Sequence, residues 1–460
     1  MGLTVPPTSD MRVLPIKSLS RVEGLYLGEF NGNVGSLSDL LMSPAPILEV
    51  AEVHFPSPPT TSHESLFRGD APHLRRLSVS GITSFPWDSP ILRNLVCLKI
   101  QRHPSEAPIL SSRADVVLAL QKITVLESLA LVHCIPDSTA DQLHVDDLVV
   151  SLAHLTNLSL AGSVQNCIGI LDHITLPRTG ITLSLDCSTS GNVTAFRVLF
   201  PIIRAAGGAT PSPFSSLKFK FSTFGCFSVT GQRLTDEKTS YLSWFAFSLF
   251  LYLKWDLQNE WNAVDVMCET CKAVSVDHHQ TLWVNSWDEF EEITDGVPAH
   301  RFEPSTWLET FGSATNVQEV NVWGHASLSF CQALSQWTSD GTSWRRRLTS
   351  QMEPNLGTYF LPRLYSLLLC LHGSQHHHIF EDGLLLQDLF AMSLRARTAC
   401  GASPLNLNLP FCTADFESAL EGLVECLEVD EYVIDTDGED GDEDEDEFFD
   451  DESDVELELQ

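Results

Sequence analysis

Cysteine and histidine are the residues of this 460-residue chain whose types and spacing could do chemistry. Cys268 and Cys271 form a C-x-x-C pair, and His278 and His279 follow it. Two thiolates so close together can fill two positions of a tetrahedral zinc site. A C-x-x-C pair also carries redox chemistry in thioredoxin-like proteins, where a strand leads into it. No second C-x-x-C follows this pair and no such strand precedes it, so zinc and redox chemistry are the minor alternatives.

The apolar residues around the pair favour a structural role. Trp261, Val264, Met267, Cys268 and Cys271 are spaced by three and four residues. That spacing is typical of the buried stripe of a helix. We therefore expect both cysteines to lie on the core side of a helix.

Signatures of catalysis are missing from the rest of the sequence. His376, His377 and His378 form a short run, which is typical of a surface loop, with adventitious metal binding as the alternative. There is no G-x-S-x-G, no phosphate-binding Walker loop, no H-E-x-x-H and no dinucleotide fingerprint. The sequence therefore predicts a protein that is not an enzyme, with no catalytic residues, no cofactor and no metal.

A short apolar pattern recurs along the chain and organises it. Its form is apolar, two residues, apolar, one residue, apolar, as in Leu74, Leu77 and Val79. The last two residues of a copy point to one face of a strand. The first copies have as their middle residues Leu25, Val53, Leu77, Leu98, Leu129, Leu158 and Leu183, and the copy at Leu183 is weaker than the others. These residues are 28, 24, 21, 31, 29 and 25 positions apart, and leucine-rich repeats recur every 20–29 residues or so.

Helical spacing between the strands completes the repeat. Residues 116–126 and 145–155 carry apolar positions three and four apart. A strand with one apolar face needs a neighbour stacked beside it. The sequence predicts an α/β fold, a leucine-rich-repeat-like solenoid of degenerate strand-plus-helix units, over residues 12–425. The pattern is clear to about residue 220 and degenerate after that, and residues 1–11 are predicted to be a flexible N-terminus.

Polar residues around the strongest strands are candidates for a binding face. Each could instead be part of a solvated strand face, but as a set they suggest the concave surface that repeat proteins commonly use for binding. The candidates are Arg75, Arg76, Asn94, Lys99, Glu127 and Asn157.

The C-terminal segment carries a concentrated negative charge. The formal net charge of the chain is −34, and 19 of its 61 acidic residues lie between Glu428 and Gln460, where there is no Lys or Arg. Such a run repels itself, so residues 426–460 are predicted to be a disordered acidic tail. The tail either keeps the chain in solution or holds a basic protein, with Phe448 and Phe449 as an apolar anchor. The remaining 42 acidic and 27 basic residues leave about −15, which argues against nucleic-acid binding.

The cellular compartment follows from the cysteines and the apolar runs. Twelve cysteines without a tight spacing pattern are typical of reduced thiols in an intracellular protein, cytoplasmic or nuclear. The first residues have no apolar signal core. The longest apolar run, residues 244–253, is too short to cross a bilayer. We therefore expect no membrane partner, and a buried helix or strand at this run.

Residues 65–100, SLFRGDAPHLRRLSVSGITSFPWDSPILRNLVCLKI, resemble fungal F-box proteins with degenerate leucine-rich repeats. The matching residues are Ala71, Pro72, Leu74, Arg75, Leu77, Pro86, Trp87, Ser89, Pro90, Leu92, Leu95, Leu98 and Ile100. In that family an F-box precedes the repeats and docks on an adaptor of a cullin–RING ubiquitin ligase, and the repeats present the substrate.

The resemblance extends over residues 12–220 and implies a protein-binding function. Too few residues precede Val22 for an F-box. We therefore expect a chain that has the substrate-binding half of such a receptor, with its F-box lost or missing from the gene model. The first hypothesis is a non-catalytic protein–protein interaction scaffold, with cullin–RING ligase components as possible partners. The alternative is a chaperone-like or scaffold protein whose acidic tail holds basic partners.

Overall fold

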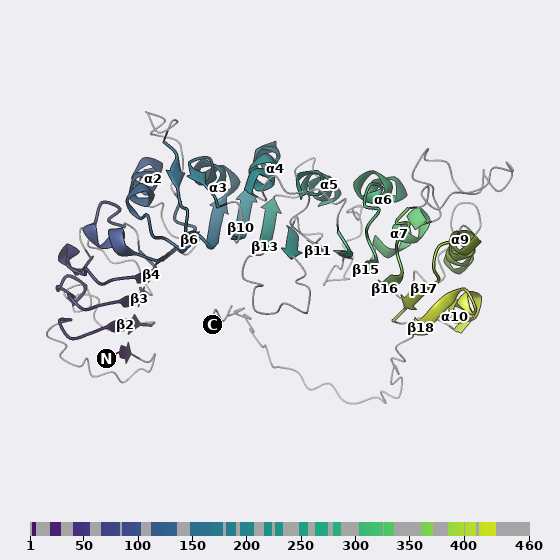
Figure 1. Cartoon of the computed structure of the whole chain (residues 1–460), viewed down its shortest axis with the longest axis horizontal. Helices are drawn as coiled ribbons and strands as arrows, with labels where there is room; N and C mark the ends of the chain where they lie inside the picture. Colours follow the sequence, from purple (N-terminus) through teal and green to yellow (C-terminus); the bar gives the residue numbers. More distant parts are fainter. Residues whose placement is uncertain are drawn as a thin grey trace, which may run out of the picture.

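The structure is a computed structural model, and the part of the chain that it describes is a mixed α/β protein (Figure 1). It describes residues 2–5, 19–28, 40–55, 66–82, 85–102, 112–135, 148–177, 181–189, 194–206, 216–222, 226–232, 248–255, 263–274, 279–286, 303–324, 326–334, 360–370, 385–399, 401–410 and 414–428.

One large, open sheet forms the inner layer of the described fold. Its sixteen strands follow the order β1-β2-β3-β4-β5-β6-β8-β10-β13-β12-β11-β14-β15-β16-β17-β18. In Figure 1 the sheet bends into an arc, with the strands on the concave side and the helices on the convex side. Its first eight strands run parallel to one another: β1 (Gly2–Val5), β2 (Gly24–Leu27), β3 (Val50–His54), β4 (Arg76–Ser80), β5 (Cys97–Gln101), β6 (Ser128–Val132), β8 (Asn157–Ser163) and β10 (Thr182–Thr189).

The C-terminal strands are also parallel to one another. They are β14 (Thr281–Ser286), β15 (Glu319–Gly324), β16 (Ser366–Cys370), β17 (Leu405–Asn408) and β18 (Val424–Glu428). A separate two-stranded sheet pairs β7 (Val150–Ser151) with β9 (Ile174–Thr175). β1 falls within residues 1–11, which the sequence predicts as a flexible N-terminus. β18 includes residues 426–428, the first three of the predicted tail, and the rest of the tail lies outside the described residues.

The chain order and the sheet order differ in the middle of the sheet. β11 (Ser216–Ser222), β12 (Cys226–Gln232) and β13 (Ser248–Trp255) form a meander in which β12 is antiparallel to both neighbours. β13 pairs with β10, and β11 pairs with β14. The three strands therefore enter the sheet in reverse order, and the apolar run of residues 244–253 contributes to β13, a strand with one buried face.

Helices line the convex side, where they cover the apolar face of the sheet. They are the 3₁₀-helices η1 (Leu66–Gly69) and η2 (Pro90–Asn94), and the α-helices α2 (Arg113–Lys122), α3 (Val164–Leu171), α4 (Thr194–Ala206), α5 (Ala263–Val274), α6 (Pro304–Phe311), α7 (Ala326–Leu334), α9 (Leu386–Ala399) and α10 (Ala414–Leu420). A capping box begins α2. The Ser112 hydroxyl accepts the N–H of Asp115 at 3.2 Å, and the Asp115 carboxylate accepts the N–H of Ser112 at 2.9 Å.

Of the two helices predicted between strands, the structure contradicts the one at residues 145–155. Residues 116–122 lie in α2, but Leu126 follows the end of that helix. Residues 148–155 contain β7 and a turn instead of a helix. The reason is that Val150, Leu152 and Leu155 bury their side chains from a short strand and the turn after it. A turn between two strands can therefore present the same spacing of apolar residues as a helix.

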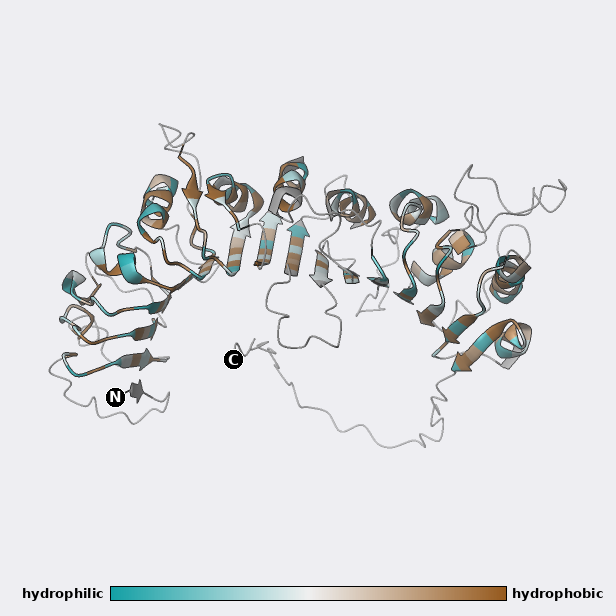
Figure 2. Cartoon of the chain, in the orientation of Figure 1, coloured by the Kyte–Doolittle hydropathy of each residue, from teal (hydrophilic) through white to brown (hydrophobic). Residues whose placement is uncertain are grey.

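Core residues of neighbouring parallel strands lie side by side in a continuous row. Each strand alternates buried and outward-facing residues, which Figure 2 shows as brown and pale bands. Every member of the row is at most 1% exposed. In the N-terminal half the row is Leu25, Ala51, Leu77, Leu98, Leu129, Leu158 and Leu183. From β11, the last meander strand in the sheet order, onward it is Leu217, Leu282, Val320, Leu367 and Leu407.

The second repeat is placed wrongly by the sequence pattern. Val53 pairs with Leu27 and so belongs to the next row of core residues. Ala51 takes the middle position between Leu25 and Leu77. Alanine is small enough to escape a search for large apolar residues, although its side chain is fully buried here.

Gly81 is a sensitive position at the end of β4. Its φ is +73°, and a Cβ added there would overlap the backbone carbonyl oxygen of Phe55. Gly401 also has a positive φ, +82°, but an added Cβ would meet nothing within 4 Å. We expect Gly401→Ala to lower the free energy of unfolding by about 1–2 kcal/mol, the cost of a left-handed backbone. Gly81→Ala should cost more, because backbone must also move, and equal losses in urea unfolding would contradict this account.

Among the described helices, none combines the length and the apolar character needed to cross a bilayer.

Candidate binding surface

The concave face of the sheet consists of the strand residues that alternate with the core. Three of the six predicted binding residues lie on it. Arg76 begins β4, Lys99 is in the middle of β5, and Asn157 begins β8. Arg76 and Asn157 share one row of the sheet, with Cys97 and Ser128 between them. These three residues are therefore spread over four neighbouring strands, β4, β5, β6 and β8, and do not form a cluster.

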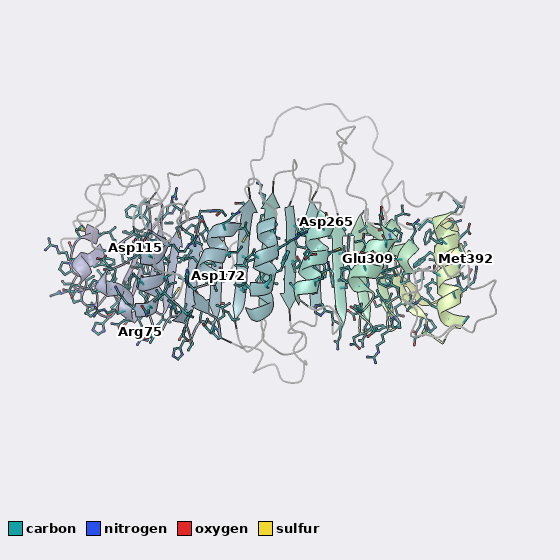
Figure 3. The ribbon with its side chains drawn as sticks, turned by 90° about the horizontal axis from the view of Figure 1, so that it is seen from above. Arg75, Asp115, Asp172, Asp265, Glu309 and Met392 are labelled. Carbon is teal, nitrogen blue, oxygen red and sulfur yellow. The ribbon has the colours of Figure 1, made fainter. Side chains whose placement is uncertain are left out.

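The other three predicted residues lie next to strands or away from them. Arg75 and Glu127 directly precede β4 and β6. Each carbonyl oxygen accepts two N–H groups where the next strand of the sheet begins, which is β5 for Arg75 and β8 for Glu127. The Glu127 carbonyl, for example, accepts the N–H of Thr156 at 2.7 Å and that of Asn157 at 3.0 Å. Asn94 ends η2, and its Nδ2 donates to the Pro72 carbonyl at 3.0 Å. Figure 3 places Arg75 toward the edge of the molecule.

A cluster of aromatic and lysine side chains occupies the middle of the concave face. We call it the central patch and define it as Lys218, Lys220, Phe250, Tyr252, Lys254 and Trp283. Phe250 is 40% exposed, Tyr252 39% and Trp283 38%. Among the described residues, the other large aromatic side chain with comparable exposure is Tyr365, directly before β16. Three of these four exposed aromatic side chains therefore lie on β13, a strand of the meander, and on β14, the strand next to it.

The strand register brings the members of the central patch together. Lys218 on β11 lies beside Trp283 on β14 and, on the other side, beside Thr230 on β12. Thr230 in turn lies beside Phe250 on β13. In the next row, Lys220 and Tyr252 flank Ser228 in the same way. The β12 residues between them, Ser228 and Thr230, have short side chains, and the lysine and aromatic side chains on either side are longer.

Electrostatic contacts within the patch involve its lysines. The Nζ of Lys218 lies 5.6 Å from the centroid of the Trp283 ring, a cation–π contact. Asp186 on β10 lies beside Tyr252. Burial raises the pKa of the Asp186 carboxyl, and the charges of His133 and Lys254 oppose that rise. A carboxylate thus borders the patch on its β10 side, where it interacts electrostatically with Lys254.

A buried aromatic layer supports the patch from behind. Phe219, between Lys218 and Lys220 on β11, is fully buried. Its ring centroid lies 6.1 Å from those of Phe227 and Phe311. Trp307 continues this layer, with its ring centroid 5.6 Å from that of Phe311. Close packing of this kind holds the patch strands at fixed positions.

The convex side carries acidic as well as basic side chains. Asp115, Asp172, Asp265 and Glu309 lie along the helical layer, as Figure 3 shows. The lysines of the patch therefore face away from a side that carries several carboxylates.

The C-x-x-C pair lies in α5, as predicted. Val264, Met267 and Cys271 are buried, whereas Cys268 is half-buried, with its Sγ 3.1 Å from the Thr310 hydroxyl. Burial raises the pKa of Cys271 well above its usual range. Trp261, His278 and residues 376–378 lie outside the described residues. Within the part of the chain that the structure describes, no three His, Cys, Asp or Glu residues are arranged to hold a metal ion.

Thiol labelling should separate buried cysteines from an exposed cysteine. Cys426 on β18 is exposed, whereas Cys134 and Cys271 are buried. Burial raises the pKa of Cys134 to about 12, and the thiolate is the reactive form. We expect iodoacetamide to modify Cys426 in the native chain and Cys134 and Cys271 only after unfolding. Raising the pH from 7 to 9 should leave Cys134 unmodified, and rapid native labelling of Cys134, measured by peptide mass spectrometry, would contradict the fold.

Comparison with known proteins adds no family. No protein-family model matches the chain, and no curated protein matches it significantly. The function is therefore inferred from the concave surface itself.

Proposed function

We propose that this protein is a non-catalytic scaffold that binds another protein on the concave face of its sheet. The observation that carries the proposal is the central patch, because exposed Phe, Tyr and Trp side chains on rigid strands are the usual anchors of protein interfaces. Three aromatic side chains, each about two-fifths exposed, lie there on β13 and β14, the strands on either side of β12 and β11. A partner that covered them would bury apolar area without ordering the strands first.

We also propose that the architecture is a leucine-rich-repeat-like solenoid. The continuous row of core residues supports this, because each strand buries its apolar face against the next unit. The return of parallel strands after the meander, at Leu282, Val320, Leu367 and Leu407, supports a repeat that continues through the second half. The meander would then be an interruption that widens the concave face.

The resemblance to fungal F-box proteins supports a more specific role, that of the substrate-binding half of a ubiquitin-ligase receptor. Most of the residues that carry the resemblance are core residues, such as Leu74, Trp87 and Leu95, which are at most 5% exposed. They therefore favour a shared architecture more than a shared partner. Cullin–RING components are partners under this proposal. The alternative partners are basic proteins held by the predicted acidic tail, residues 426–460.

Affinity capture with matched variants tests the proposal. The full chain is used as bait beside a Tyr252→Ala/Trp283→Ala variant and a Leu118→Ala variant, since Leu118 is 45% exposed on α2 of the convex side. We expect a specific partner with the wild type and Leu118→Ala, and a loss of roughly tenfold or more with the double variant, as for interface hot spots. Circular dichroism and melting temperature confirm that each bait is folded.

Three outcomes of the capture experiment are informative. Equal recovery by the folded double variant would overturn the proposed concave site. Recovery of cullin-adaptor subunits would support the receptor role. Recovery of basic proteins that depends on the acidic segment and ignores the patch would support the alternative function.

A further inference from the structure

We propose that the acidic segment of this chain, residues 429–460, binds back onto the central patch of the same molecule. The segment would then occupy the centre of the concave face and compete with any protein that binds there. The inference concerns the chain alone and does not depend on knowing that protein.

Charge complementarity is the first argument. Lys218, Lys220 and Lys254 are three of the eight lysines in the chain, and they lie on β11 and β13, the two outer strands of one meander. The acidic segment has 18 Asp and Glu residues and no Lys or Arg. Two carboxylates also face this part of the sheet. Asp186 borders the patch on β10, and Glu319 on β15 accepts a hydrogen bond of 2.8 Å from the Tyr365 hydroxyl.

The charge of the remaining surface strengthens this argument. Outside the segment from Glu428 onward the chain still has about 15 more acidic than basic residues, so its net charge does not attract the segment. The convex helices carry carboxylates such as Asp115 and Asp265. A second basic area, with Arg76 and Lys99, lies on β4 and β5 near the N-terminal end of the sheet. It lacks exposed large aromatic side chains among its described residues.

Reach is the second argument. β18 ends at Glu428, and five strand spacings along the sheet separate β18 from β11. At roughly 4.8 Å per spacing this is about 24 Å. Phe448 is 20 residues beyond Glu428, and 20 extended residues span up to about 66 Å. The segment can therefore bring Phe448 and Phe449 onto the patch with ample slack.

Aromatic contact is the third argument. Phe448 and Phe449 lie within the acidic run, with six consecutive acidic residues directly before them. Lysines beside exposed rings suit such a sequence, because carboxylates can pair with the lysines while the phenyl rings pack on Phe250, Tyr252 and Trp283. Covalent linkage keeps the local concentration of the segment in the millimolar range, so weak contacts suffice.

Zero-length cross-linking of the full chain tests the inference. A carbodiimide couples lysine amines to carboxylates that touch them, and peptide mass spectrometry maps the links. We expect links from Lys218, Lys220 and Lys254 to residues 429–460. Lys122 and Lys272 on the convex helices and Lys99 on β5 are internal controls. A mixture of isotopically heavy and light chains distinguishes links within one molecule from links between molecules.

The cross-links should respond to both kinds of contact. Raising the sodium chloride concentration should reduce the patch links several-fold, because salt screens exposed charges. A Phe448→Ser/Phe449→Ser variant should lose more of its patch links at high salt than the wild type does. Links spread evenly over all lysines, links concentrated on Lys99, or links only between molecules would each overturn the inference. The proposed function would survive those outcomes, since partner capture tests it separately.

Discussion

Replacing Arg397 with methionine is expected to lower the free energy of unfolding by roughly 3–5 kcal/mol, because each buried acceptor left without a donor costs about 1–3 kcal/mol. Arg397 lies on α9 and is 2% exposed. Its guanidinium donates to the carbonyl oxygens of Phe360, Leu361 and Leu364, at 2.9, 3.1 and 3.3 Å. The Leu361 carbonyl also accepts the N–H of Leu364, so the substitution leaves the Phe360 and Leu364 carbonyls without this donor. Methionine keeps much of the apolar stem and removes every one of these donors.

The neighbouring Arg395 provides the matched control. It is exposed on the same helix, so Arg395→Met should change the free energy of unfolding by no more than about 0.5 kcal/mol. Urea unfolding followed by circular dichroism measures both variants. Residues 360–364 lead into β16 and Tyr365, so Arg397 connects the convex helix to the concave face. Similar stability of the two variants would mean that this connection does not exist.

Replacing Trp307 with alanine is expected to cost roughly 3–5 kcal/mol, as for other buried aromatic residues. Trp307 is fully buried, and its Nε1 donates to the Ser329 hydroxyl at 2.9 Å. Its ring centroid lies 5.0 Å from that of Phe330 and 5.6 Å from that of Phe311. Because Phe311 packs on Phe219 directly behind the central patch, the cavity should loosen the patch as well.

Two other tryptophan substitutions sharpen this prediction. Trp307→Phe keeps most of the ring packing and loses the hydrogen bond to Ser329, so it should cost only about 1–3 kcal/mol. Trp283→Ala removes an exposed ring and its contact with Lys218, and should cost about 1 kcal/mol or less. Guanidinium unfolding should therefore rank the losses as Trp307→Ala, Trp307→Phe, Trp283→Ala. A larger loss for Trp283→Ala than for Trp307→Ala would mean that the two faces of the sheet are assigned wrongly.

The parallel strands could be predicted from the sequence because their core positions follow a local pattern. Each strand contributes two large apolar residues two positions apart, and this signal is present even after residue 220, in the strands that contain Leu282, Val320, Leu367 and Leu407. Ala51 is the exception, since its small side chain fits the core without resembling a repeat position.

The central patch could not be predicted in the same way. Its residues come from β11, β13 and β14, and the reversed strand order that joins them depends on pairing between distant segments. A local pattern carries no information about which strand becomes a neighbour. One signal was available. In residues 248–255 leucines alternate with aromatic residues, and an aromatic residue at an outward-facing strand position indicates a surface that another molecule covers.

The predicted binding residues show the opposite limitation. Arg75 and Asn94 were selected because they are polar and flank strong repeats, but Asn94 donates its side-chain hydrogen bond to the Pro72 carbonyl. Polarity next to a strand does not distinguish a side chain that faces a partner from one that supports a turn. The alternation of buried and outward-facing residues along a strand does distinguish them, and it places Arg76, Lys99 and Asn157 on the outward-facing side.

The most direct test of the central claim is the dissociation constant of the captured partner for two single variants. Trp283→Ala changes the concave patch, and Val198→Ala changes a residue that is 53% exposed on α4 of the convex side. Both should fold like the wild type. Calorimetric titration should show binding weakened by roughly tenfold or more for Trp283→Ala, as for interface hot spots, and no change for Val198→Ala. Equal affinities for Trp283→Ala and wild type, or a loss only with Val198→Ala, would contradict a binding site on the concave face.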